Sequence, residues 1–63
     1  MTKEKFTAYE VVRQSGVTNM FDSNAVANYA LLLADTELSR ADIIDIITNY
    51  TEYNTRWPEV RNG

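Results

Sequence analysis

The segment between Ser39 and Pro58 limits the possible fold more than any other part of the sequence, because it opens with a strong helix start signal. Ser39 is a suitable N-cap, and Asp42 can bond back to the backbone of Ser39 in a capping box. Leu38 and Ile43 stand where a hydrophobic staple would form. A helix is therefore predicted to begin at about residue 40.

Apolar residues then recur with a period of about 3.6. They are Ile43, Ile46, Ile47, Tyr50, Tyr53 and Trp57. Isoleucine by itself favours strands, but Asp45 interrupts the run and the helical spacing continues. Pro58 cannot stand in a helix interior. The sequence predicts one helix over residues 40–57.

A second helix start lies at Asp22, which can serve as an N-cap with Phe21 and Val26 as the staple. The apolar stripe that follows consists of Val26, Tyr29, Ala30 and Leu33, with Leu32 beside it. The periodicity breaks at Asp35. A helix over residues 23–34 is predicted.

A first helix is predicted over residues 4–15, where the apolar face consists of Phe6, Tyr9 and Val12. Gly16 suits the left-handed position that often follows a helix. The start of this helix has two interpretations. Thr2 can be the N-cap, or Thr7 can form a capping box with Glu10.

Three helices joined by short turns make the predicted fold class all-α, with the architecture of a small three-helix bundle. The expected core consists of Phe6, Tyr9, Val12, Met20, Phe21, Val26, Tyr29, Leu33, Ile43, Ile47 and Tyr50. Phe21 is predicted to be a buried anchor whose truncation would cost about 3–5 kcal/mol. Residues 59–63 are expected to fray, because no apolar partner is foreseen for them.

The chain of 63 residues forms at most one domain, and it contains no cysteine and no histidine. A core of this size rarely supplies more than about 3–5 kcal/mol. Disulfides, and metal sites built from Cys or His, are excluded. Stability must therefore come from helix packing or from association with another chain.

The absence of histidine also removes the commonest general base. Asp42 and Asp45 lie on the solvent side of the predicted helix, where they favour the helix dipole rather than share a proton. Gly16 and Gly63 are the only glycines, which excludes a glycine-rich phosphate loop. No enzyme activity, cofactor or metal is predicted.

The longest apolar stretch, Val26–Ala34, falls far short of the roughly 20 residues that span a membrane, so no membrane association is expected. The net charge of −3 disfavours phosphate backbones. Two helices joined by a short turn still leave a helix-turn-helix as an alternative. Its recognition helix would carry three acidic residues, Asp42, Asp45 and Glu52, and only two basic ones, Arg40 and Arg56. That balance has the wrong sign for DNA or RNA.

The turn before the second helix reads Thr18-Asn19-Met20-Phe21-Asp22, with Arg13 and Gly16 ahead of it and Asn24-Ala25-Val26 after it. Over residues 11–30 this pattern resembles a family of small bacteriophage and prophage proteins that have no assigned function. The resemblance implies a phage-encoded protein acting in the cytoplasm of a bacterial host. It implies no activity.

Turn and cap chemistry can account for the Thr18–Asp22 block, since asparagine and aspartate bond readily to nearby backbone amides. The functional alternative is a recognition loop that presents Asn19 and Met20 to a partner.

Tyr50, Tyr53 and Trp57 form the other candidate binding site. A helix over residues 40–57 would be roughly 27 Å long against roughly 18 Å for the other two, so its end should project. Tyr53 and Trp57 would then form an exposed aromatic ridge, of the kind that interfaces favour. The simplest partner is a second copy of the chain, as a homodimer. The alternative is that these rings fill the bundle, with their polar tips at its edge.

The sequence therefore favours a non-enzymatic phage or prophage accessory protein that acts through protein–protein interaction. Its partner would be another protein or a second copy of itself. The alternatives are a small helix-turn-helix-like nucleic-acid-binding regulator and a minor virion or assembly component.

Overall fold

The computed structural model describes the backbone of residues 1–62 and the side chains of residues 1–60. Five helices follow one another: α1 (Lys3–Ser15), α2 (Ser23–Ala34), α3 (Arg40–Thr48), α4 (Tyr50–Arg56) and α5 (Pro58–Asn62). No strand occurs in residues 1–62. The domain is all-α, as the sequence predicts.

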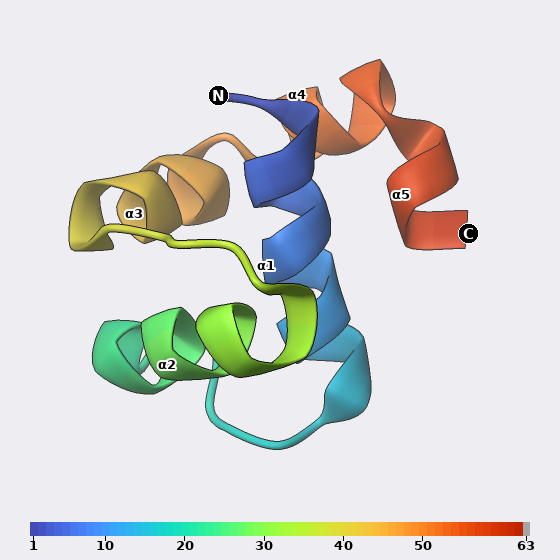
Figure 1. Ribbon diagram of the computed structural model, residues 1–63. Helices are drawn as coiled ribbons and strands as arrows, with labels where there is room; N and C mark the ends of the chain where they lie inside the picture. Colours follow the sequence, from blue (N-terminus) through green and yellow to red (C-terminus); the bar gives the residue numbers. More distant parts are fainter. Residues whose placement is uncertain (63) are drawn as a thin grey trace.

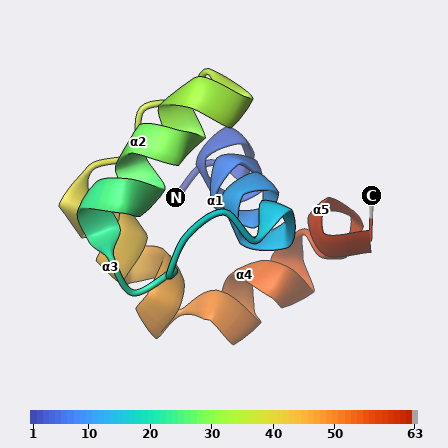
Figure 2. The same ribbon diagram turned by 90° about the horizontal axis from the view of Figure 1, so that it is seen from below.

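The first helix lies at the centre of the arrangement. α1 packs against α2, α3 and α5, and each later helix also packs against the one before it. Figure 1 shows α2 beside the lower half of α1, with α3 on one side of α1 and α5 on the other. In the view from below, α2, α3, α4 and α5 follow one another around α1 (Figure 2). The core therefore forms around a central α1.

The signals at the ends of the first two helices act as predicted. The Thr2 hydroxyl accepts a hydrogen bond from the Lys5 amide at 3.2 Å, so α1 begins at the earlier of its two candidate starts. Gly16 follows α1 in the left-handed conformation with φ 67°. The Asp22 carboxylate accepts a hydrogen bond from the Ala25 amide at 3.2 Å and caps α2, which has the predicted bounds.

The capping box of α3 is confirmed in both directions. The Asp42 amide donates to the Ser39 hydroxyl at 3.0 Å, and the Ser39 amide donates to the Asp42 carboxylate at 3.0 Å. Leu38 and Ile43, the predicted staple, are both buried. Local signals of three to four residues therefore place the starts of α1, α2 and α3.

The predicted continuous helix over residues 40–57 is wrong at Asn49, where α3 ends and α4 begins. The Asn49 side chain donates to the Asp45 backbone carbonyl at 3.2 Å and to its carboxylate at 2.8 Å. The Asn49 backbone amide also donates to the Asp45 carbonyl at 2.9 Å, so the side chain adds to the last turn of α3 without replacing its backbone bond. Asparagine forms such local bonds readily, and it is disfavoured in helix interiors. The chain changes direction at this point, and α4 turns back toward α1.

The expectation of a frayed tail over residues 59–63 is also wrong as far as residue 62, because α5 forms there. Pro58 is the first residue of α5, a position at which its missing N–H does no harm. Val60 is partly buried against the core, and Lys3 pairs with Glu59 at 3.2 Å. Gly63 lies outside the described residues.

The buried hydrophobic core differs from the expected one in several positions. It consists of Phe6, Ala8, Tyr9, Val12, Val26, Ala30, Leu38, Ile43, Ile46 and Tyr53. Met20, Tyr29, Ile47 and Tyr50 are only partly buried against it. The predictions for Phe21 and Leu33 are wrong, since Phe21 is 82% exposed and Leu33 is 48% exposed. Neither side chain reaches the strip of α2 that faces the other helices.

The acid stability of the domain should depend on Asp42. Its pKa is lowered by the Ser39 amide and by Lys5, whose ammonium lies 3.1 Å from the carboxylate. A lowered pKa contributes stability that is present above about pH 4 and is lost as pH falls through the folded-state value. Asp42→Ala should therefore cost about 1 kcal/mol at pH 7, with the deficit shrinking toward pH 2.

Urea denaturation of both proteins between pH 2 and 7 measures this difference. Glu37→Ala, which removes an exposed acid just before α3, is the matched control and should change stability by less than about 0.5 kcal/mol. A deficit for Asp42→Ala that stays constant across the range would contradict the assignment.

Candidate functional site

The three aromatic residues predicted to bind a partner lie against α1 instead. The Phe6 ring centroid is 5.8 Å from that of Tyr50, 6.0 Å from that of Tyr53 and 5.9 Å from that of Trp57. Tyr9 also contacts Tyr50, at 6.3 Å between centroids. Tyr53 is 8% exposed, and the other two predicted residues are half-buried. These rings extend the core.

The premise of a projecting aromatic ridge is therefore wrong, and the bend at Asn49 is the reason. The accessible surface is 3985 Å², close to the about 4,100 Å² expected for a folded monomer of this mass. The radius of gyration is 10.3 Å, against about 10.6 Å for a compact domain of this length. No two-turn extension beyond the bundle is present in residues 1–62.

A buried carboxylate lies beside the aromatic cluster. Glu10 is 1% exposed, and its Oε2 lies 2.7 Å from Nε of Arg13. The Tyr50 hydroxyl donates to its other oxygen. The hydrogen bond to Glu10 raises the pKa of Arg13. Both oxygens of Glu10 are thus occupied by groups of the chain itself, and the carboxylate links α1 to α4.

Asp45 makes a second link of the same kind. The Tyr53 hydroxyl donates to both of its carboxylate oxygens, at 3.0 and 2.9 Å, and the Asn49 amide donates to one of them. The hydrogen bond to Asp45 raises the pKa of Tyr53. Asp45 therefore holds α4 in its bent position, rather than lying on a solvent face as predicted.

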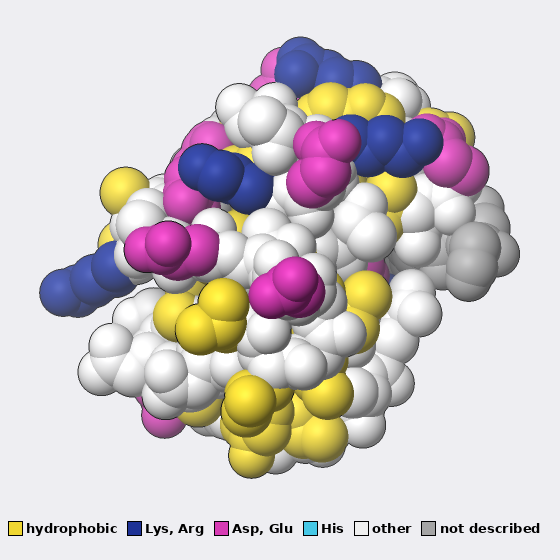
Figure 3. All heavy atoms as spheres, viewed as in Figure 1, with side chains coloured by type: hydrophobic (Ala, Val, Ile, Leu, Met, Phe, Trp, Pro, Cys, Tyr) yellow, Lys and Arg dark blue, Asp and Glu magenta, His cyan; other side chains and the backbone are white. Residues whose placement is uncertain are grey.

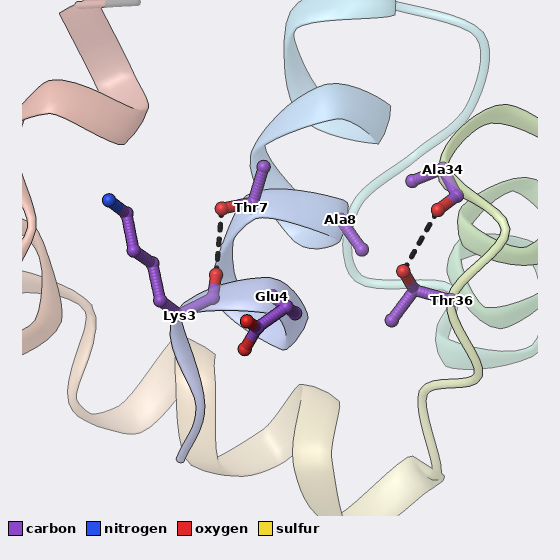
Figure 4. A pocket seen from close by; sticks show the side chains of 6 residues that line it. All are labelled: Lys3, Glu4, Thr7, Ala8, Ala34 and Thr36. Carbon is purple, nitrogen blue, oxygen red and sulfur yellow. Dashed lines mark hydrogen bonds between the residues drawn. The ribbon is translucent and has the colours of Figure 1, made fainter.

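A shallow hollow of about 370 Å³ opens between the start of α1 and the chain after α2 (Figure 4). Its lining residues are Lys3, Glu4, Thr7, Ala8, Ala34 and Thr36. The Thr7 hydroxyl donates to the Lys3 carbonyl at 2.7 Å, and the Thr36 hydroxyl donates to the Ala34 carbonyl at 2.9 Å. The Lys3 ammonium points away from the hollow. The two threonine hydroxyls that line the hollow thus bond to backbone carbonyls rather than point at a ligand.

Among the described residues, no group of three or more Asp, Glu, His or Cys side chains is placed to hold a metal ion. None of their helices combines the length and the apolar character needed to cross a membrane.

The Asn19–Asp22 turn exposes Phe21 rather than presenting Asn19 and Met20, the two residues predicted to contact a partner. Asn19 accepts a hydrogen bond from the Phe21 amide at 2.9 Å, and its carbonyl accepts one from the Asp22 amide at 3.0 Å. Met20 is partly buried against the core. Phe21 stands out of this turn into solvent, with 82% of its surface exposed. Turn chemistry thus accounts for Asn19, and the exposed ring is Phe21.

The largest exposure of apolar side chains on a single helix is on α2. Leu31 is 55% exposed, Leu32 is 76% exposed and Leu33 is 48% exposed. Only Val26 and Ala30 of this helix are fully buried, and the helix contains no charged residue. In Figure 3, hydrophobic side chains gather at the lower end of the molecule, where Figure 1 places α2. We call Phe21, Leu31, Leu32 and Leu33 the α2 surface.

Acidic residues lie at both ends of the α2 surface. Asp22 caps the start of α2, and Asp35 follows its end in the left-handed conformation with φ 49°. Glu37 lies two residues further on, and all three acids are exposed. The sequence from Gly16 to Ser39 contains no lysine or arginine. The α2 surface therefore carries apolar side chains at both ends of the helix, each close to an acidic residue, with the exposed Asn24 and Asn28 between them.

Sequence reasoning missed this surface, although the triplet Leu31-Leu32-Leu33 contained the signal. Consecutive helix residues are rotated by about 100°, so three in a row spread over more than half of the circumference. A helix packed on one side can bury only part of such a triplet. Exposure is greatest at Leu32 and lower on either side, so Leu32 is its centre.

No known protein family, curated protein sequence or solved structure matches the chain. The resemblance of residues 11–30 to small phage and prophage proteins therefore stays a prediction.

Proposed function

We propose that the protein is a non-enzymatic phage or prophage accessory protein that binds another protein through the α2 surface. The observation that carries this proposal is the exposure of three adjacent leucines and Phe21 on and beside a helix without charges. Several large apolar side chains exposed together on a small domain are typical of an interaction site.

The energetics favour binding of moderate strength. Burial of a fully exposed side chain of this size contributes about 1.5–3 kcal/mol. Because the four side chains are between 48% and 82% exposed, covering all of them would contribute about 4–8 kcal/mol in total. Association costs at least about 4 kcal/mol in lost translational and rotational freedom. The α2 surface can therefore carry a binding event only when a partner adds further favourable contacts.

Affinity purification of the tagged protein from a bacterial host tests the proposal. Leu32→Gln removes the centre of the patch without adding charge, and it should reduce recovery of a specific bound protein at least tenfold. Thr51→Gln, at an exposed position of α4, is the matched control and should not reduce recovery, because α4 lies away from α2 in Figure 2.

Circular dichroism melting of each variant shows whether it remains folded. Equal recovery of every bound protein by the wild type and by folded Leu32→Gln would contradict the assignment of the surface. Salt-dependent retention on DNA that Leu32→Gln does not alter would favour the nucleic-acid-binding alternative.

A further inference from the structure

The charges around the α2 surface indicate what kind of partner it accepts. The α2 surface has Phe21 at one end of a helix of 12 residues, or about 18 Å, and the three leucines at the other end, with the exposed Asn24 and Asn28 between them. Asp22 stands at one end, and Asp35 and Glu37 stand at the other. The nearest bases along the chain are Arg13, which is paired with Glu10, and Arg40, which begins α3. In space, Lys5 lines a hollow with Glu37, and Lys3 lines one with Ala34, but their ammonium groups pair with Asp42 and Glu59. The lower end of the view in Figure 3 shows apolar and acidic side chains without a basic one.

We propose that the α2 surface accepts an amphipathic helical segment of a partner protein, with leucine-like residues along one face and lysine or arginine at both ends. This inference rests on the proposed function and specifies its partner. An apolar helix stripe is matched in shape by another helix, whose side-chain ridges fit its grooves. Basic ends about 18 Å apart would meet Asp22 on one side and Asp35 with Glu37 on the other.

A second copy of the chain is a poorer occupant of the same surface. In a two-fold pair with antiparallel α2 helices, Asp22 of each copy would approach Asp35 of the other. In a parallel pair, each acid would approach its own counterpart. Both arrangements place like charges together beside a desolvated strip, which is unfavourable. The same acidic ends disfavour an anionic membrane or a nucleic acid.

Titration of the full chain with two synthetic helical peptides of about 14 residues tests this inference. Both peptides carry leucines at helical spacing; one carries two lysines at each end and the other two glutamates. We expect the lysine peptide to bind with 1:1 stoichiometry by isothermal titration calorimetry. The glutamate peptide should bind at least tenfold more weakly, and the difference should shrink as salt rises from 50 to 500 mM.

Variants of the protein separate the apolar and the charged contributions. Leu32→Gln should weaken binding of the lysine peptide about tenfold. The double variant Asp35→Asn, Glu37→Gln should weaken it about fivefold and flatten its salt dependence. Asparagine tolerates the left-handed conformation at position 35, so the double variant should stay folded.

Equal affinity for the two peptides would overturn the inference, as would failure of the lysine peptide to bind. Self-association in light scattering that is lost in Leu32→Gln would assign the surface to a second copy instead. None of these results contradicts the proposed function if Leu32→Gln still abolishes recovery of a bound cellular protein in the affinity purification. The proposed function fails only if Leu32→Gln leaves that recovery unchanged.

Discussion

Phe6→Ala should leave little folded protein, because it is expected to lower the free energy of unfolding by about 3–5 kcal/mol. Phe6 has no exposed surface, and its ring lies about 6 Å from the rings of Tyr50, Tyr53 and Trp57. Removal of this ring opens a cavity between α1 and α4. A domain of this size has a total stability of about 3–5 kcal/mol, so the loss is comparable to the whole.

Phe21→Ala is the matched control, since it deletes the same ring from a position that is 82% exposed. It should change the free energy of unfolding by less than about 0.5 kcal/mol. Circular dichroism at 222 nm during thermal and urea denaturation measures both variants. A folded Phe6→Ala with an unchanged melting temperature would contradict the structure, and so would an unfolded Phe21→Ala.

Arg13→Met should lower the free energy of unfolding by about 2–3 kcal/mol. The substitution leaves the Glu10 carboxylate, which is 1% exposed, without the guanidinium that lies 2.7 Å from it. Loss of one partner of a buried pair costs about 3–5 kcal/mol, and the expected value is smaller because the Arg13 side chain is 35% exposed.

A double-mutant cycle isolates the pair from other effects of the substitution. Glu10→Gln combined with Arg13→Met should recover part of the loss, because the buried charge is then removed as well. Lys3→Met breaks the exposed pair with Glu59, at 3.2 Å, and should cost less than about 1 kcal/mol. A loss for Arg13→Met no larger than that for Lys3→Met would show that Glu10 does not depend on its partner.

The aromatic residues Tyr50, Tyr53 and Trp57 and the α2 surface were the two candidate binding sites, and the sequence and the structure favour different ones. The sequence singled out Tyr50, Tyr53 and Trp57 because large rings at helical spacing are typical of interfaces. The same rings are equally suited to fill a core, and the sequence could not distinguish the two roles. Once the chain bends at Asn49, the rings pack on Phe6, and the leucines of α2 and Phe21 are left as the exposed apolar side chains.

The amino-acid sequence by itself determined the helical class and the starts of α2 and α3, and it narrowed the start of α1 to two candidates. Thr2, Asp22 and the Ser39–Asp42 box act on amides only three residues away, so these signals need no contact between helices. The left-handed turn at Gly16 is local in the same sense.

Only the tertiary structure decided where α4 and α5 lie and which apolar side chains are buried. The helix is interrupted at Asn49, where the Asp45 carboxylate accepts hydrogen bonds from the Asn49 side chain and from the Tyr53 hydroxyl, so contacts between α3 and α4 hold the bend. Burial in α2 depends on how wide a strip the neighbouring helices cover, and here they cover only Val26 and Ala30 completely. Helical periodicity marks which residues share a face, but neighbouring helices determine which face is buried.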